Sequence, residues 1–314
     1  MNKRIIFFGT PEFASICLLK ILENKFNVAA VVTAPDKPSG RGKKKASSAV
    51  KKIAEENKLK ILQPTNLKDP CFIDELKILK PYMFVVVAFR MLPRVVWSIP
   101  FKTTFNLHAS LLPNYRGAAP INWAIINQEK LTGVTTFIIN EKIDSGEILL
   151  QRKLKINLHD DAGSLQNKLS KMGSELVCDT INGIIKETIC PKVQKLSGEE
   201  KIAPKLDKKN TFIDWSQPIE AINSKIKGLS PYPGAKTRFI ENYNTKIIKI
   251  FEAEVIKKSH DFKLNQVLIK NREILVCVRD GFLKCNILQF PNKKRMLALD
   301  ILNGHTFSSK IEVN

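Results

Sequence analysis

The stretch "TFNLHASLLPNYRGAAPINW" (residues 104–123) contains, in order, an apolar run, a loop rich in turn residues and the start of a helix. We place the start of the helix at Pro120, because proline is favoured at the first position of a helix. Two polar residues, Asn106 and His108, stand two apart in the apolar run. The stretch therefore predicts a β-strand that ends in two hydrogen-bonding side chains and is followed by a helix.

The same alternation of strand and helix extends through the first half of the chain. Several of the apolar runs are apolar on both faces, which is typical of strands buried in a parallel sheet. We predict strands at residues 4–9, 28–34, 83–89, 104–110 and 133–140, and helices at residues 11–24, 120–130 and 164–185. This order predicts an α/β fold with a doubly wound, mostly parallel Rossmann-like sheet. Functional residues of such folds lie at the carboxyl ends of the strands.

The pattern changes after residue 189. Residues 190–209 are polar and rich in lysine and include two prolines, which is typical of a linker. Short strands with turn residues between them follow, and they predict a small OB-like β-barrel. We therefore expect a catalytic domain at residues 1–189, a linker at 190–209 and a C-terminal β-barrel domain at 210–314.

Composition excludes several classes of protein. The chain has 314 residues, of which 44% are hydrophobic, and this is enough for a globular core. No apolar run is long enough for a membrane span, and the N-terminal apolar run is too short for a signal peptide. The six cysteines form no C-x-x-C pair, so we expect a reduced, cytoplasmic protein without a metal site. No nucleotide cofactor is expected, because neither G-x-G-x-x-G nor a P-loop pattern occurs.

The net charge of +21 has two explanations. Residues 1–209 contain 34 basic and 20 acidic residues (+14), and residues 210–314 contain 17 and 10 (+7), so the excess is spread evenly. A lysine-rich background composition and an acidic partner such as a nucleic acid both explain such a spread. Only local clusters of charge are informative, and residues 37–52 form one, with seven basic residues and no acidic one.

Asn106 and His108 share one face of their strand, because residues i and i+2 point the same way, while Leu107 points into packing on the other face. From Asn-x-His alone, a pair of hydrogen-bonded core residues is the simpler interpretation. The later segment "GVTTFIINEKIDSGEILLQ" (133–151) adds a third element, a strand followed by a loop that contains Asp144. If this loop lies at the same end of the sheet, Asp144 can reach His108.

These residues carry a resemblance. "FNLHASLLPNYRGAAP" and "GVTTFIINEKIDSGEILLQ" resemble the shared core of the folate-dependent formyltransferases, which has Asn-x-His, Ser-Leu-Leu-Pro and a strand followed by an Asp-x-Gly loop. The likeness continues through "IIFFGTPEFA", "DKPSGRGKK" and "DWSQP…LSPYPGA". Within this family the chain most resembles the enzymes that formylate methionyl-tRNA.

The resemblance implies transfer of the formyl group of 10-formyltetrahydrofolate to the α-amine of methionyl-initiator tRNA, without a metal. Asn106, His108 and Asp144 would be the catalytic residues. The amide of Asn106 can donate to the developing oxyanion, and His108 can move the proton of the amine. Asp144 would orient the imidazole and favour its protonated form through its negative charge. A monomeric protein is also implied.

The resemblance further implies two binding regions. The folate would contact the Ser-Leu-Leu-Pro segment and the end of the strand at 83–89, and the residues implied are Ser110, Leu111, Leu112, Pro113, Phe89 and Arg90. The segment at residues 89–91 is shorter than the corresponding segment of the family, and its side chains are bulkier. The acceptor stem of the tRNA would contact the basic cluster at residues 37–52, and the residues implied are Arg41, Gly42, Lys43, Lys44 and Lys45. Without the resemblance, a solvated loop is the simpler interpretation of that cluster.

Two other hypotheses remain. One is a folate formyltransferase that acts on a ribonucleotide amine or an amino sugar, which would share the three catalytic residues but need neither the basic cluster nor the barrel. The other is a non-catalytic RNA-binding relative that keeps only the fold. A protein that only binds RNA has no need for Asn106, His108 and Asp144 together.

Overall fold

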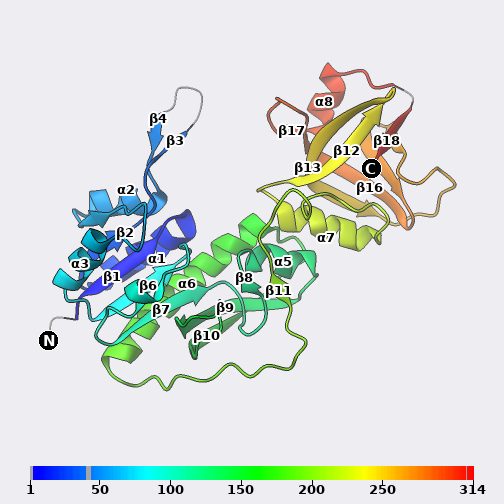
Figure 1. Cartoon of the computed structure of the whole chain (residues 1–314). Helices are drawn as coiled ribbons and strands as arrows, with labels where there is room; N and C mark the ends of the chain where they lie inside the picture. Colours follow the sequence, from blue (N-terminus) through cyan, green and yellow to red (C-terminus); the bar gives the residue numbers. More distant parts are fainter. Residues whose placement is uncertain (1–2, 40–43, 309) are drawn as a thin grey trace. The chain divides into compact units, whose positions relative to one another are not determined.

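The computed structural model describes residues 3–39, 44–308 and 310–314 (Figure 1). The chain divides into two compact units. The first contains Met1–Gly117, Leu131–Lys155 and Gln166–Ile202, and the second contains Ala118–Lys130, Ile156–Leu165 and Ala203–Asn314. Two segments that precede residue 189, Ala118–Lys130 and Ile156–Leu165, therefore belong to the second unit.

A seven-stranded sheet forms the centre of the first unit, in the order β10-β9-β7-β6-β1-β2-β5. Five of its strands are parallel: β1 (Ile5–Gly9), β2 (Val28–Val32), β5 (Ile61–Leu62), β6 (Met83–Val87) and β7 (Thr103–His108). The last two, β9 (Leu131–Ile138) and β10 (Ile148–Lys155), are antiparallel. The predicted Rossmann-like sheet, mostly parallel, is confirmed.

Helices pack on both faces of this sheet. On one face, Phe8 of β1 and Phe84 of β6 pack with Phe72 and Leu76 of α3. On the other, Leu107 of β7 contacts α6 so closely that a Cβ at Gly173 would lie 2.8 Å from its side chain. The helices of the first unit are α1 (Glu12–Glu23), α2 (Ala49–Glu56), α3 (Pro70–Ile78), α4 (Arg94–Trp97) and most of α6 (Ala162–Ile185).

Several features of the first unit were not predicted, and three of them concern β9, β10 and the basic cluster. The first is the direction of β9, which pairs antiparallel with β7 although helix α5 (Pro120–Ile126) lies between the two strands in the chain. The second is β10 itself. The third lies in the basic cluster, where β3 (Lys37–Ser39) and β4 (Lys44–Ala46) pair as an antiparallel hairpin. Two further short strands, β8 (Arg116–Gly117) and β11 (Ile202–Ala203), have two residues each.

An antiparallel barrel forms the centre of the second unit, with strands in the order β14-β15-β16-β13-β12-β18. The ring closes where the backbone N–H of Val313 donates to the carbonyl of Asn265 at 2.9 Å. The predicted C-terminal β-barrel is confirmed. Its strands are β12 (Ala235–Glu241), β13 (Asn244–Ile256), β14 (Val267–Lys270), β15 (Glu273–Val278), β16 (Gly281–Gln289) and β18 (Ile311–Val313), and β17 (Met296–Leu297) pairs with β16.

A helix that the sequence analysis did not predict, α7 (Ile219–Leu229), belongs to the core of the barrel unit. Ile222 and Ile226 are buried there with Ile248 of β13. α7 also packs against α5 (Pro120–Ile126), where the side chain of Asn122 donates to the carbonyl of Gly228 at 2.7 Å. The remaining helix is α8 (Ala298–Gly304).

Within the ranges that the structure describes, no helix is both long enough and apolar enough to cross a membrane. In the same ranges, no group of three or more His, Cys, Asp or Glu residues is arranged to hold a metal ion. All six cysteines are free thiols.

Ile226→Ala should lower the free energy of unfolding of the barrel by about 2–5 kcal/mol, because the change leaves a cavity in a fully buried core. Ile247→Ala, at a position that is 52% exposed on β13, is the matched control and should cost no more than about 0.5 kcal/mol. Calorimetry of the two full-length variants measures the difference. Equal effects would contradict the assignment of α7 to the core.

Candidate active site

Strand β7 brings Asn106 and His108 to one face of the sheet. Asn106 is paired in register with Val86 of β6, and its side chain is half-buried. Within the described part of the chain, no group forms a hydrogen bond with its carboxamide. His108 is 7% exposed and is paired with Thr135 of β9. Asn106 therefore presents an amide that is free to donate next to a buried imidazole.

The hydrogen bond of His108 determines which of its ring nitrogens carries a proton. Its Nε2 lies 2.8 Å from the carbonyl oxygen of Tyr115. A carbonyl can only accept, so Nε2 must donate. The other nitrogen, Nδ1, lies 3.7 Å from Oδ2 of Asp144, which is beyond hydrogen-bonding distance. Nδ1 is therefore the atom that can accept a proton from a bound molecule, with a carboxylate beside it.

The loop between β9 and β10 carries Asp144. The residue has a left-handed backbone conformation (φ 49°), and its Oδ2 accepts a hydrogen bond of 2.8 Å from the backbone N–H of Gly117. The structure thus brings Asp144 to His108 on the strand that also holds Asn106.

The predicted folate-binding residues of the Ser-Leu-Leu-Pro segment directly follow β7. Ser110 and Leu112 are buried, and Leu111 and Pro113 are half-buried. The hydroxyl of Ser110 donates to the carbonyl of Asn114 at 2.7 Å. The two half-buried residues are therefore better placed than the two buried ones to contact a ligand with their side chains.

The sequence analysis missed Thr135, which fixes this segment. Its fully buried hydroxyl donates to the carbonyl of Ser110 at 2.7 Å and accepts from the backbone N–H of Leu112 at 3.2 Å. The side chain of Gln151 donates to the same hydroxyl at 2.9 Å. The two adjacent threonines in "GVTT" were the available signal, because a hydroxyl on a buried strand needs a partner.

The other two predicted folate-binding residues follow β6. Phe89 is half-buried and packs edge-on against Phe8, with ring centroids 5.7 Å apart. Arg90 is exposed, and its guanidinium donates to the carbonyls of Thr65 (2.8 Å) and Pro64. Arg90 therefore connects the loop after β6 to the segment after β5 by hydrogen bonds.

The structure describes the backbone of two of the five predicted tRNA-binding residues. Arg41, Gly42 and Lys43 lie outside the described residues, and Lys44 and Lys45 belong to strand β4. The described backbone of the basic cluster thus contains two paired strands, β3 and β4, and the start of α2.

Three buried cysteines are poor candidates for nucleophiles. Burial raises the pKa of the thiols of Cys178 and Cys277 to about 11 and that of Cys285 to about 12. These thiols are therefore protonated at neutral pH and cannot act as thiolate nucleophiles.

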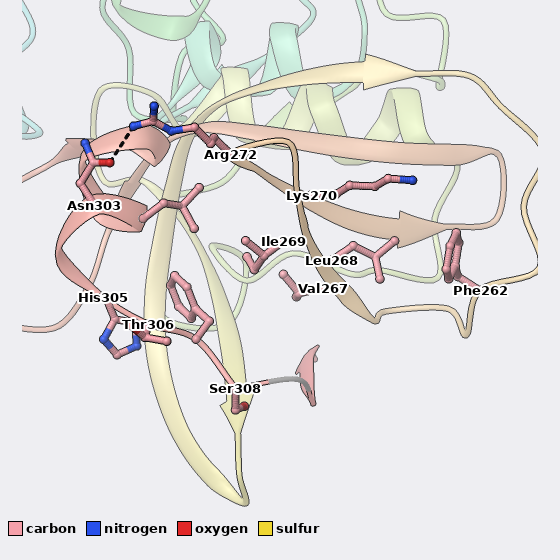
Figure 2. Close-up of a pocket in the computed structure, with 12 residues that line it drawn as sticks. Phe262, Val267, Leu268, Ile269, Lys270, Arg272, Asn303, His305, Thr306 and Ser308 are labelled. Carbon is pink, nitrogen blue, oxygen red and sulfur yellow. Dashed lines mark hydrogen bonds between the residues drawn. The ribbon is translucent and has the colours of Figure 1, made fainter.

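The barrel has a pocket of its own, of about 800 Å³, which Figure 2 shows. An apolar floor that includes Val267 and Ile269 lies beside polar groups, among them Arg272, whose guanidinium donates to the side chain of Asn303 at 2.8 Å. None of the predicted catalytic or folate-binding residues lines it.

Fold and site together define a class of protein. It is an α/β protein in which one strand of the mostly parallel sheet carries an amide donor and a histidine, and the loop after the neighbouring strand carries an aspartate beside that histidine. The comparisons identify the family. The Formyl transferase family model matches residues 3–181, and the model for the Formyl transferase, C-terminal domain, matches residues 205–306. The chain belongs to the formyl transferase family.

Relatives of known name cover the chain over nearly its full length. It is 48% identical to the methionyl-tRNA formyltransferase of Flavobacterium johnsoniae, across 99% of this chain and 98% of that protein. It is 42% identical to the methionyl-tRNA formyltransferase of Bacteroides thetaiotaomicron, across 99% and 98%.

Solved structures show the same fold at low sequence identity. An N-formyltransferase from Helicobacter canadensis aligns with a TM-score of 0.65 at 22% identity and covers 92% of this chain and 100% of that one. HypX from Aquifex aeolicus aligns with a TM-score of 0.66 at 17% identity, over 97% of this chain and 48% of that one.

Thr135→Val should lower the free energy of unfolding by about 1–3 kcal/mol, because the valine keeps the shape but leaves the buried N–H of Leu112 without an acceptor. Thr103→Val is the matched control, since no hydrogen bond to its hydroxyl occurs among the described residues. Urea unfolding of both variants measures the difference. A loss no larger than that of the control would show that the hydroxyl does not fix the segment.

Proposed function

We propose that this chain transfers the formyl group of 10-formyltetrahydrofolate to the α-amine of methionyl-initiator tRNA, which yields formylmethionyl-tRNA for the initiation of translation. Similarity to methionyl-tRNA formyltransferases over nearly the full length supports the reaction. The observation that carries the chemistry is the position of His108 Nδ1. This atom forms no hydrogen bond with the described residues and lies 3.7 Å from Asp144, on the strand that also presents Asn106.

In the proposed mechanism, the amine nitrogen attacks the formyl carbon and a tetrahedral oxyanion forms. The carboxamide of Asn106 donates to this oxyanion. It can do so without first breaking another bond, because it is half-buried and forms no hydrogen bond with the described residues. The bond between the formyl carbon and the folate nitrogen then breaks, and the folate nitrogen takes up a proton.

His108 moves that proton. Nδ1 accepts it from the attacking amine, while Nε2–H remains bonded to the carbonyl of Tyr115. The nearby carboxylate of Asp144 stabilises the imidazolium that forms, because opposite charges attract strongly in a partly buried site. His108 then gives the proton to the folate nitrogen, so the enzyme returns to its starting state.

For the folate we propose that Leu111, Pro113 and Phe89 form the wall of the pocket, with backbone groups of Ser110, Leu112 and Arg90. This set is supported by half-buried apolar side chains next to β6 and β7. A pterin is planar and forms hydrogen bonds along its edges, which suits such a surface.

A cluster of cations on the barrel supports a nucleic acid as the acceptor. Lys236 and Lys249 are directly opposite each other on β12 and β13. Burial, together with the positive charges of Lys236 and Arg295, lowers the pKa of the Lys249 ammonium. Like charges in this position destabilise a sheet, and among the described residues none of the three forms an ion pair. A phosphate would relieve the repulsion.

The aromatic neighbour of this cluster suits the same ligand. The guanidinium of Arg295 lies 3.8 Å from the ring centroid of Phe251. We propose that residues 210–314 bind tRNA through the cationic cluster Lys236, Lys249 and Arg295. Residues Arg41, Gly42, Lys43, Lys44 and Lys45 of the basic cluster would contact the acceptor stem, which the local excess of basic residues supports.

We also propose that the protein acts as a monomer in the cytoplasm. Six free thiols support a reducing compartment.

Formyl transfer by the purified chain tests the proposal, with methionyl-initiator tRNA, glycinamide ribonucleotide and a nucleotide-linked amino sugar offered separately as acceptors. Transfer to the tRNA alone is expected. Transfer only to one of the small amines would contradict the proposed acceptor while keeping the chemistry.

Asn106→Ala should lower kcat about 10²-fold to 10³-fold, because the oxyanion loses its donor, while the affinity for the folate changes little. The exposed Asn24 on the surface after α1 provides a matched control, Asn24→Ala, which should keep normal turnover. Single-turnover kinetics and folate titration measure the two effects. Near-normal kcat in Asn106→Ala would remove this residue from the mechanism.

Replacing Lys236, Lys249 and Arg295 together by glutamine should weaken tRNA binding and flatten its salt dependence. Each lost phosphate contact should reduce the slope of log K against log salt by about 0.7–0.9. The control replaces three exposed lysines of the first unit, Lys68, Lys171 and Lys186. Equal changes in slope would mean that diffuse charge, rather than the cluster, holds the tRNA.

A further inference from the structure

Gln194 is a buried amide in the polar segment 190–209 and is only 7% exposed. Its Nε2 donates two hydrogen bonds to the loop that carries Asp144, one to the carbonyl of Asp144 (2.9 Å) and one to the carbonyl of Gly146 (2.7 Å). Both N–H groups of the side chain are therefore directed at the backbone on either side of Ser145.

The other end of the same side chain contacts Arg116. Its Oε1 accepts from Nε (3.1 Å) and Nη2 (2.6 Å) of the guanidinium. Carbonyls cannot donate and a guanidinium cannot accept, so these partners fix the orientation of the amide. Gly117, the residue after Arg116, donates its backbone N–H to the carboxylate of Asp144. Gln194 thus links two contacts of Asp144. It binds the backbone of Asp144 directly, and it binds Arg116, whose neighbour Gly117 holds the Asp144 side chain.

The backbone near Gln194 is anchored to the same sheet. Lys192 exchanges two backbone hydrogen bonds with Ile148, the first residue of β10, at 2.7 and 2.9 Å. Because Lys192 is bonded to the residue at which the 139–147 loop ends, the backbone next to Gln194 is held close to that loop.

The Asp144 loop needs such a contact because of the direction of β9. Ile138, the last residue of β9, is opposite Phe105, three residues before His108. This corresponds to about 10 Å along the strand. Residues 139–147 must therefore return along the sheet before Asp144 can reach His108, and a loop of this length has many other conformations.

We propose that Gln194 is a positioning residue that holds Asp144 at His108 by fixing the backbone of residues 144–146. This inference rests on the proposed function, because its effect on turnover passes through the His108–Asp144 pair. Gln194 itself would touch neither the folate nor the amine.

Gln194→Glu isolates the contact. A glutamate has nearly the same shape and keeps the acceptor for Arg116, but it has no N–H for the two carbonyls and places a negative charge beside them. We expect kcat to fall about 10-fold to 100-fold, as displacement of a catalytic group by about 1 Å does, with folate affinity within about twofold. Gln217→Glu, at an exposed glutamine of the second unit, is the matched control.

Combination with Asp144→Ala separates positioning from a general structural role. In the Asp144→Ala background, Gln194→Glu should cause no further loss of kcat, since there is no carboxylate left to position. Full additivity of the two losses, or normal kcat in Gln194→Glu, would overturn the inference. Gln194→Met, which removes the donors without adding charge, repeats the test if the glutamate variant does not fold.

Hydrogen–deuterium exchange gives a readout that does not depend on activity. Gln194→Glu should speed exchange of the Gly117 amide and of residues 139–147, and leave exchange in β6 unchanged. Unchanged exchange at Gly117 would overturn the inference even if the wild-type chain transfers no formyl group. A wild-type chain without transfer activity but with faster exchange in the variant would instead refute the proposed function alone.

Discussion

The direction of β9 is the constraint on which the site depends. If β9 were parallel to β7, its following loop would start beside His108, where the carboxyl ends of parallel strands meet. Because β9 is antiparallel, it ends opposite Phe105, and the loop must return to bring Asp144 within 3.7 Å of His108 Nδ1. The contacts of Gly117 and Gln194 with this loop follow from that requirement. In this protein the acid partner is therefore placed by tertiary hydrogen bonds and not by its own strand.

A second consequence concerns the imidazole. The carbonyl of Tyr115 holds Nε2–H, so the orientation of His108 is set by the segment after β7, and Asp144 is left to act through charge. The same segment contains four of the six residues proposed for the folate, and Thr135 holds it from β9. In the proposed mechanism, the acid–base residue and most of the folate-binding residues thus lie on one strand and directly after it, so the position of the formyl donor depends on the position of His108.

The sequence could predict those parts of the fold that short-range patterns determine. Apolar runs gave the strands around Asn106, and the period of two placed Leu107 on the opposite face, where α6 covers it. Helix α7 was missed although Ile219, Ile222 and Ile226 have helical spacing, because only short strands were predicted for residues 210–314. Gln194 had no local signal at all. A glutamine among lysines in a polar segment is buried only through contacts with residues about 50 and 80 positions away.

The central claim is that His108 and Asp144 act as one unit, with the carboxylate effective only through the imidazole. A double-mutant cycle measures this directly, with kcat determined for His108→Ala, Asp144→Ala and the double variant. The account predicts strong non-additivity, in which the double variant is hardly slower than His108→Ala. Two losses that simply multiply would contradict it, because Asp144 would then act on the reaction independently of His108.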